Sequence, residues 1–221
     1  MRIEKASGKA IRYACLKYHY AQAVPQIRLG YSVFNESNEW CGVVLFSNGA
    51  NPNLATEYDL VQGQVVELVR VALNGKQKYT SQVLGACIRE LKKDAPQVKI
   101  IVSYADRNQD HIGTIYQATN WLYMDERSNE RGIMLKGKLT HRRSISKKYG
   151  NSGIAWLKKH VDPNTHVVKG KPKIKYVFPM NKWERRKLNK LAKPYPKKNI
   201  NFTADNKINS SDGKSKISSV N

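Results

Sequence analysis

The sequence predicts an α/β fold, in which a mixed central sheet is flanked by helices and followed by a basic C-terminal extension. Three observations support this prediction. From residue 64 onward the expected elements follow the order β-α-β-α-β-β, which is typical of a sheet with crossover helices. Two of those strands, at 64–73 and 99–104, are strongly apolar, as strands buried on both faces are. After Leu139 the composition becomes basic.

The N-terminal part supplies one helix and two strands. Residues 8–24 are expected to form a helix, because apolar side chains recur at helical spacing until Pro25. Residues 28–35 alternate and are aromatic, which predicts a strand, and the continuous apolar run at 40–47 predicts a central strand. Residues 48–63 are rich in Asn, Pro and Gly. A loop of about 16 residues inside a compact domain is usually functional or disordered.

The middle of the chain carries the crossover pattern. The expected elements are a strand at 64–73, a helix at 80–94, a strand at 99–104, a short helix at 111–119, and strands at 121–125 and 132–139. Thr80 or Ser81 supplies the hydroxyl that caps the long helix, and Pro96 follows its end. Beyond Leu139 we expect a short helix at 152–161, a strand at 173–180 and a basic helix at 181–191.

Positive charge is concentrated in the C-terminal part. Residues 1–135 hold 16 basic and 13 acidic residues, whereas residues 136–221 hold 23 and 4. Displaced phosphate counterions contribute most of the non-specific affinity for DNA, so a nucleic acid is the expected partner. The composition predicts a core at 1–140, a basic nucleic-acid-binding extension packed on it at 141–197, and a disordered tail at 198–221.

The sequence does not resemble that of a membrane or secreted protein. No window approaches the roughly 20 apolar residues of a membrane span. No apolar segment follows the polar first ten residues, so no secretory signal is expected. Cys15, Cys41 and Cys87 are odd in number and far apart, which predicts reduced thiols in the cytoplasm.

Residues 64–125 resemble the core of the GNAT acyltransferase superfamily. A buried strand (QVVELVRVAL), a long helix, a second strand (KIIVSYAD) and a short helix within IYQATNWLYM follow in that order. The finer sequence is similar to the Mom proteins of Mu-like phages, and the resemblance extends over most of residues 15–150. The segments that carry it are YHY at 18–20, CGVVLFSNGANPNLAT at 41–56, VVELVRVALNG at 65–75, VSYAD at 102–106 and IYQATNWLY at 115–123.

The resemblance to Mom proteins implies a phage DNA-modification enzyme. Such an enzyme converts adenine in double-stranded DNA to N6-carbamoylmethyladenine, which shields the DNA from host restriction. A target adenine is expected to leave the base stack and enter a pocket. The resemblance to GNAT enzymes implies that Tyr116 serves as the general acid toward the leaving group.

Two donors are expected, acetyl-CoA or glycyl-tRNA. GNAT members hold the CoA pyrophosphate on a glycine-rich turn after the central strand, where backbone N–H groups point at the phosphates. Here that place has one glycine and two lysines, and the candidate residues are Asn74, Gly75, Lys76 and Lys78. The product favours a glycyl group from charged tRNA, since an acetyl donor leaves the amide nitrogen of the product unexplained.

Two charged residues on the strand at 64–73 are candidate catalytic groups. Charges on an apolar strand are costly unless they are paired or line a cleft. Glu67 is a candidate general base, and Arg70 is a candidate ligand for a phosphate or carbonyl oxygen. Their odd separation predicts that they point to opposite faces of the sheet. Structural ion pairing explains both residues nearly as well.

Further candidates lie at the end of the first helix and after the strand at 99–104. His19 and Tyr20 belong to an aromatic stretch suited to stacking bases. Asp106, preceded by Ser103, lies where ligands gather in open α/β sheets and is a candidate to deprotonate adenine N6. His19, Tyr20 and Asp106 together are a candidate iron or zinc site. The structural alternatives are helix packing for His19 and Tyr20, a turn cap for Asp106 and core packing for Tyr116.

Two groups of residues are expected to contact DNA. Asn48, Asn51 and Asn53 in the long loop are candidates for reading an adenine edge, because Asn contacts adenine with two hydrogen bonds. Turn formation explains them nearly as well. The densest basic cluster beside the core is expected to contact phosphates, and its members are His141, Arg142, Arg143, Lys147 and Lys148.

Two other functions stay open from the sequence. One is an enzyme of the same fold that acts on RNA or on another substrate. The other is a non-catalytic DNA-binding protein. No helix-turn-helix, zinc-finger or RNA-binding aromatic motif is present in the sequence, and this disfavours the second of these.

Overall fold

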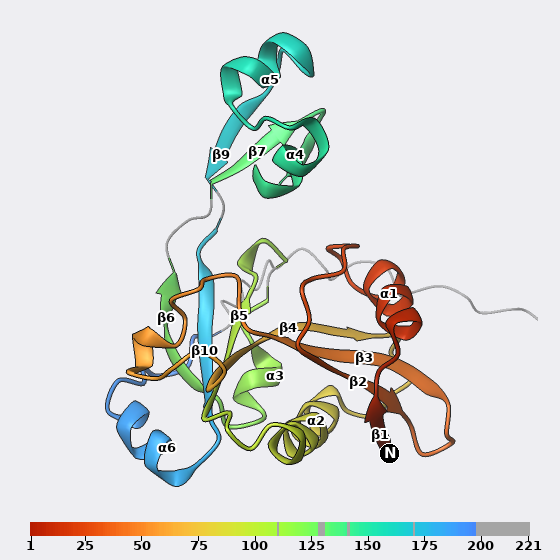
Figure 1. Ribbon diagram of the computed structural model, residues 1–221, viewed down its shortest axis with the longest axis vertical. Coiled ribbons are helices and arrows are strands. Elements are labelled where there is room, and N and C mark those ends of the chain that lie inside the picture. Colours follow the sequence, from red (N-terminus) through yellow and green to blue (C-terminus); the bar gives the residue numbers. More distant parts are fainter. Residues whose placement is uncertain (110, 128–130, 141, 170, 198–221) are drawn as a thin grey trace, which may run out of the picture.

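The computed structural model describes residues 1–109, 111–127, 131–140, 142–169 and 171–197 (Figure 1). A seven-stranded main sheet has the order β1-β2-β3-β4-β5-β10-β6. Its strands are Arg2–Lys5 (β1), Leu29–Phe34 (β2), Trp40–Ser47 (β3), Val65–Leu73 (β4), Ile100–Ala105 (β5), Lys173–Pro179 (β10) and Leu122–Arg127 (β6). All neighbours are antiparallel except β4 and β5, which are parallel. The expected mixed α/β fold is therefore confirmed.

Helices and one loop cover both faces of the main sheet. The helices of this body are Gly8–Lys17 (α1), Thr80–Asp94 (α2), Thr114–Gln117 (α3) and Lys182–Asn189 (α6). α2 and α3 pack on one face, where Leu84 of α2 joins Phe46 and Ile101 in the largest core cluster. α1 covers part of the opposite face through Ala14 and Cys15. The loop at 48–63, with its 3-10 helix Thr56–Tyr58, and α6 cover the rest of that face.

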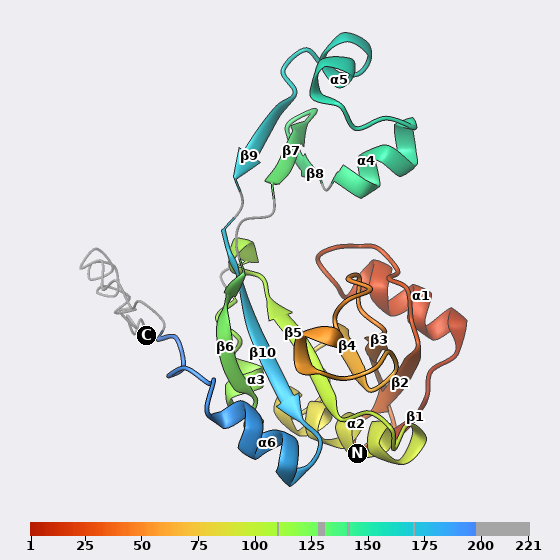
Figure 2. The ribbon, with the colours of Figure 1, turned by 60° about the vertical axis from the view of Figure 1, so that its left-hand side comes forward.

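The chain between β6 and β10 forms a second, smaller sheet, and we call residues 131–169 the inserted module. Its elements are Arg131–Leu135 (β7), Lys138–Thr140 (β8), Arg142–Tyr149 (α4), Ile154–His160 (α5) and His166–Lys169 (β9). β7 lies between β8 and β9. The module has its own core of Ile133, Leu135, Ile145 and Leu157. Figures 1 and 2 show it standing apart from the main sheet, beyond the ends of β6 and β10.

Two expected elements differ from the structure for local reasons. The helix expected at 8–24 ends at Lys17, because His19 Nδ1 accepts the Ala21 N–H at 3.1 Å and competes with helical hydrogen bonding. The single strand expected at 132–139 is a hairpin instead. Lys136 and Gly137 both have positive φ, 50° and 70°, as the two central residues of a tight hairpin turn require.

Most of the other expected elements lie close to their predicted bounds, although the short helix expected at 111–119 covers only Thr114–Gln117. The strand expected at 173–180 is β10, and it joins the main sheet between β5 and β6. The division of the chain at residue 140 stays a prediction, and the tail expected at 198–221 lies outside the described residues. In the part of the chain that the structure describes, no helix is long and apolar enough to cross a membrane.

Candidate active site

The candidate site lies where β4 and β5 stop pairing. Their parallel ladder ends at Glu67 and Val102. Just beyond it β4 bulges against β3, because Leu68 pairs with Phe46 and Arg70 with Leu45, which leaves Val69 as an extra residue. A pocket of about 650 Å³ opens at this place, lined by residues of both strands.

All seven candidate catalytic residues line this pocket. They are His19, Tyr20, Glu67, Arg70, Ser103, Asp106 and Tyr116. They come from the turn after α1, from β4, from β5 and the residue that follows it, and from α3. The fold therefore brings together a set of polar residues that the sequence separates by almost a hundred positions.

The bulge corrects one expectation about the charged pair on β4. Glu67 and Arg70 were expected on opposite faces because their separation is odd. That expectation is wrong, since both side chains line the same pocket. The extra residue Val69 shifts the alternation by one position, so residues three apart come to share a face.

Tyr116 and Ser103 form a short hydrogen-bonded chain inside the pocket. The Ser103 hydroxyl donates to the Leu68 carbonyl oxygen at 2.9 Å and lies 2.8 Å from the Tyr116 hydroxyl. A serine has one hydroxyl proton, so with both bonds made Tyr116 donates to Ser103. Burial raises the pKa of Tyr116 and the Ser103 contact lowers it, because Ser103 can turn its proton toward a phenolate.

Arg70 contributes a positive charge to the pocket, and one of its N–H donors has no hydrogen-bond partner among the described residues. Its Nη1 donates to the Val69 carbonyl oxygen at 2.7 Å. Its Nε is buried and has no hydrogen-bond partner among the described residues. A buried donor without a partner is costly, so the group is suited to an oxygen atom supplied by a ligand.

His19 is held as a neutral ring. Burial, and to a smaller extent the charges of Arg70 and His111, together lower the pKa of His19 to about 4. Its Nδ1 accepts a backbone N–H, so the proton of the neutral ring lies on Nε2. His19 is therefore suited to accept a proton or to contact a base, rather than to serve as a fixed positive charge.

The depressed pKa of His19 predicts a pH-dependent stability. The unfolded chain takes up a proton on this residue near pH 6.5, whereas the folded chain does so near pH 4. The folded state is therefore expected to lose stability as pH falls through this window. Urea midpoints at pH 4.5 and pH 7 should differ less in His19→Gln than in the natural chain. Equal pH dependence in both proteins would contradict the assignment.

Tyr20 and Asp106 form the rim of the pocket. The Tyr20 hydroxyl donates to Asp106 Oδ2 at 3.2 Å, and burial together with this carboxylate raises the pKa of Tyr20 to about 12. The His19 and Tyr20 rings lie 4.3 Å apart. The structure gives the expected iron or zinc site no support, since no group of three His, Cys, Asp or Glu side chains in the described ranges is placed to hold a metal.

The pocket also contains residues that sequence reasoning did not assign to it. Lys173 at the start of β10 lines it, although it is far from the other members in sequence. His111 lines it too, with its ring centroid 6.2 Å from that of Tyr20. The polar turn after β5 was a signal for His111. No local signal marks Lys173, because its position depends on β10 joining the sheet beside β5.

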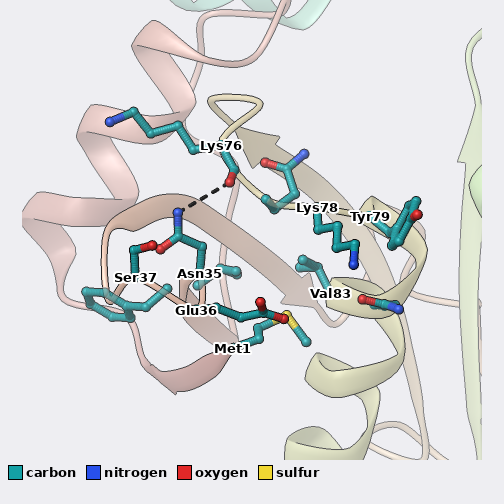
Figure 3. Close-up of a pocket in the computed structure, with 12 residues that line it drawn as sticks. Met1, Asn35, Glu36, Ser37, Lys76, Lys78, Tyr79 and Val83 are labelled. Atoms are coloured by element: carbon teal, nitrogen blue, oxygen red, sulfur yellow. Dashed lines mark hydrogen bonds between the residues drawn. The ribbon is translucent and has the colours of Figure 1, made fainter.

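The expected donor loop lies apart from the large pocket. Lys76 and Lys78 line a smaller pocket of about 200 Å³ beside the start of α2 (Figure 3). Asn74 Oδ1 accepts the Lys76 N–H at 3.0 Å, and the Lys76 ammonium lies 2.9 Å from Glu39. Gly75 has φ of 87° and open space around it. The Lys76 N–H and ammonium are thus already partnered within the protein, and the role of this loop in holding a donor stays a prediction.

The described residues among those expected to contact DNA do not line the pocket. Asn48 Oδ1 accepts from Arg28 at 3.3 Å, and Asn51 Oδ1 accepts the Asn53 N–H at 3.0 Å, so two of these amides stabilise local structure. In the basic cluster, Arg142, Lys147 and Lys148 are exposed on α4 and Arg143 belongs to the same helix. His141 lies outside the described residues.

Comparisons with known proteins place this geometry in a family. A family model described as the Mom protein family matches residues 1–197. No curated protein matches the chain.

Among the solved structures that match this chain in three dimensions are several acetyltransferases. An acetyltransferase of Bacillus subtilis in complex with CoA has 12% identity and a TM-score of 0.46, over 80% of this chain and 97% of that one. The spermidine N-acetyltransferase SpeG of Vibrio cholerae has 8% identity and a TM-score of 0.48, over 85% and 99%. A GNAT family acetyltransferase of Elizabethkingia anophelis with acetyl-CoA bound has 14% identity and a TM-score of 0.45, over 80% and 97%.

Proposed function

Because the chain belongs to the Mom protein family, we propose that it converts adenine in double-stranded DNA to N6-carbamoylmethyladenine and so shields phage DNA from host restriction. The observation that supports this most directly is the family match over residues 1–197, a range that includes every residue of the large pocket. The pocket is open and lined by aromatic and charged groups, which suits an adenine turned out of the duplex.

The chain's own residues would supply the acid-base chemistry of transfer. Adenine N6 attacks the carbonyl carbon of a glycyl ester, and the bond from that carbon to the tRNA ribose oxygen breaks. Arg70, with its unpartnered Nε, stabilises negative charge on the carbonyl oxygen. Glu67 or Asp106 accepts the proton from N6, and Tyr116 donates a proton to the departing oxygen.

A rearrangement then completes the carbamoylmethyl group. The new glycyl amine attacks C6 of the base and forms a five-membered spiro intermediate. The bond between C6 and the original N6 breaks, and that nitrogen becomes the terminal amide of the product. All atoms of the glycyl group and of adenine are retained, so no oxidant or second nitrogen donor is needed.

Mass spectrometry of nucleosides tests the proposal. Plasmid DNA from cells that express the chain should contain N6-carbamoylmethyladenine, and DNA from cells without it should not. Unmodified adenine in the presence of folded protein would refute the proposed function. Growth with nitrogen-labelled glycine separates the donors, because a glycyl donor places the label on the nitrogen bonded to C6. An acetyl-CoA donor leaves that nitrogen unlabelled.

A further inference from the structure

The inserted module has its own core and joins the main body beside a residue that lines the large pocket. Its core of Ile133, Leu135, Ile145 and Leu157 is distinct from the clusters of the main body. The chain leaves the main sheet after β6 and returns at Lys173, which pairs with Arg127 at the end of β6 and lines the pocket. The module is therefore connected to the main body beside a residue that lines the pocket, and Figure 2 shows it beyond the ends of β6 and β10.

The module is strongly basic for its size. Residues 131–169 contain ten Lys and Arg residues and a single acidic residue, Asp162. That carboxylate has a local role, since it accepts the backbone N–H groups of Lys136 and Asn164 at 2.6 and 2.9 Å. A single carboxylate cannot neutralise ten cations, so the module keeps a large positive charge.

The cations of the module whose side chains the structure describes are exposed and make no ion pair with a described residue, whereas several cations of the main body are paired. Eight have side chains that the structure describes, namely Lys136, Lys138, Arg142, Lys147, Lys148, Lys158, Lys159 and Lys169, and all are exposed. None of these eight makes an ion pair with any described residue. In the main body, by contrast, Lys187 near the end of α6 pairs with Asp59 and Lys193 pairs with Asp125.

We infer that the inserted module is the part of the protein that binds the DNA duplex. It does so by contacting backbone phosphates that flank the adenine in the pocket. This inference rests on the proposed function for the identity of the substrate. The composition predicted DNA contacts over the whole basic C-terminal part of the chain, and this inference limits them to residues 131–169. It also names Lys158 and Lys159 of α5 as phosphate contacts, in addition to the basic cluster at 141–148.

A duplex fits this surface better than a protein partner does. The cations lie on two helices, a hairpin turn and two strands, so they are spread over the module rather than gathered at one point. The phosphates of a duplex are likewise distributed along its backbone, and contacts to them do not depend on the base sequence. Each neutralised phosphate releases a counterion, so the module should make binding strongly dependent on salt.

Salt-dependent binding of a DNA duplex tests the inference with the full chain. Two double variants, Lys147→Gln/Lys148→Gln and Lys158→Gln/Lys159→Gln, remove the same charge from α4 and α5. The control is Lys182→Gln/Lys190→Gln, which removes two exposed cations, one at the first residue of α6 and one just after its end. Fluorescence anisotropy with a labelled duplex gives the slope of log affinity against log salt. Each module variant should flatten it by roughly 2, and the control should leave it unchanged.

The outcomes distinguish this inference from the proposed function. A flattened slope in the module variants supports the inference even if no modified adenine is found, because binding does not require chemistry. Unchanged slopes, or equal changes in the α6 control, overturn it. Loss of binding to uncharged tRNA with duplex binding intact also overturns it, and assigns the module to the donor. Matching circular dichroism spectra show that the exposed substitutions leave the fold intact.

Discussion

Replacing Tyr116 with Phe is expected to lower the rate of adenine modification by about 10²–10⁴-fold, the usual contribution of a positioned general acid. The substitution removes only the hydroxyl that points at Ser103, and the ring keeps its contacts with Trp121 and Tyr176. Ser103 can still donate to the Leu68 carbonyl oxygen, so no buried serine proton is left without a partner. The measurement is the yield of modified nucleoside over time at equal amounts of folded protein.

Two further variants separate chemistry from structure. Tyr31→Phe removes a hydroxyl that donates to Asp94 at 3.0 Å outside the pocket, so it should cost stability and leave the rate unchanged. Ser103→Ala keeps the Tyr116 hydroxyl but removes the group that lowers its pKa. The alkaline limb of the pH–rate profile should then move to higher pH. A Tyr116→Phe variant as fast as the natural chain would exclude Tyr116 as the acid.

The order of elements was predictable because the signals are local. Apolar runs such as 40–47 and 64–73 can be buried on both faces only inside a sheet, and both are strands of the main sheet. The place of β10 was not predictable in this way. Its segment alternates like any strand, but its position between β5 and β6 depends on long-range pairing with residues 46 to 79 positions away.

The residues of the site were predictable by type, whereas their geometry was not. Polar residues on apolar strands, such as Glu67 and Ser103, indicated a cleft and do line one. The bulge at Val69 brings Glu67 and Arg70 together, and nothing in the alternation of the strand marks it. The helix ends before His19 because the His19 side chain accepts a backbone N–H. The apolar periodicity of the sequence, which continues past this point, gives no sign of that contact.

Arg70→Met is expected to lower the modification rate by about 10²–10³-fold, the usual loss when one donor to a developing oxyanion is removed. The pocket would lose both the positive charge of Arg70 and the buried Nε donor that has no hydrogen-bond partner among the described residues. Arg89→Met is the matched control, since Arg89 is exposed on α2 and does not line the pocket. It should keep the rate of the natural chain.

The same variant has a readout that does not depend on activity. The Arg70 charge helps to hold the pKa of His19 at about 4, so the pKa of His19 should rise in Arg70→Met and stay low in Arg70→Lys. Titration of the imidazole by NMR measures this directly.

Arg70→Lys keeps the charge but lacks the planar guanidinium and its Nε donor, so its rate should stay well below that of the natural chain. A low rate together with a low His19 pKa in Arg70→Lys would show that the direction of the donor matters more than charge alone. A His19 pKa that stays near 4 in Arg70→Met would instead place the cause entirely in burial, and would remove the electrostatic link between the two residues.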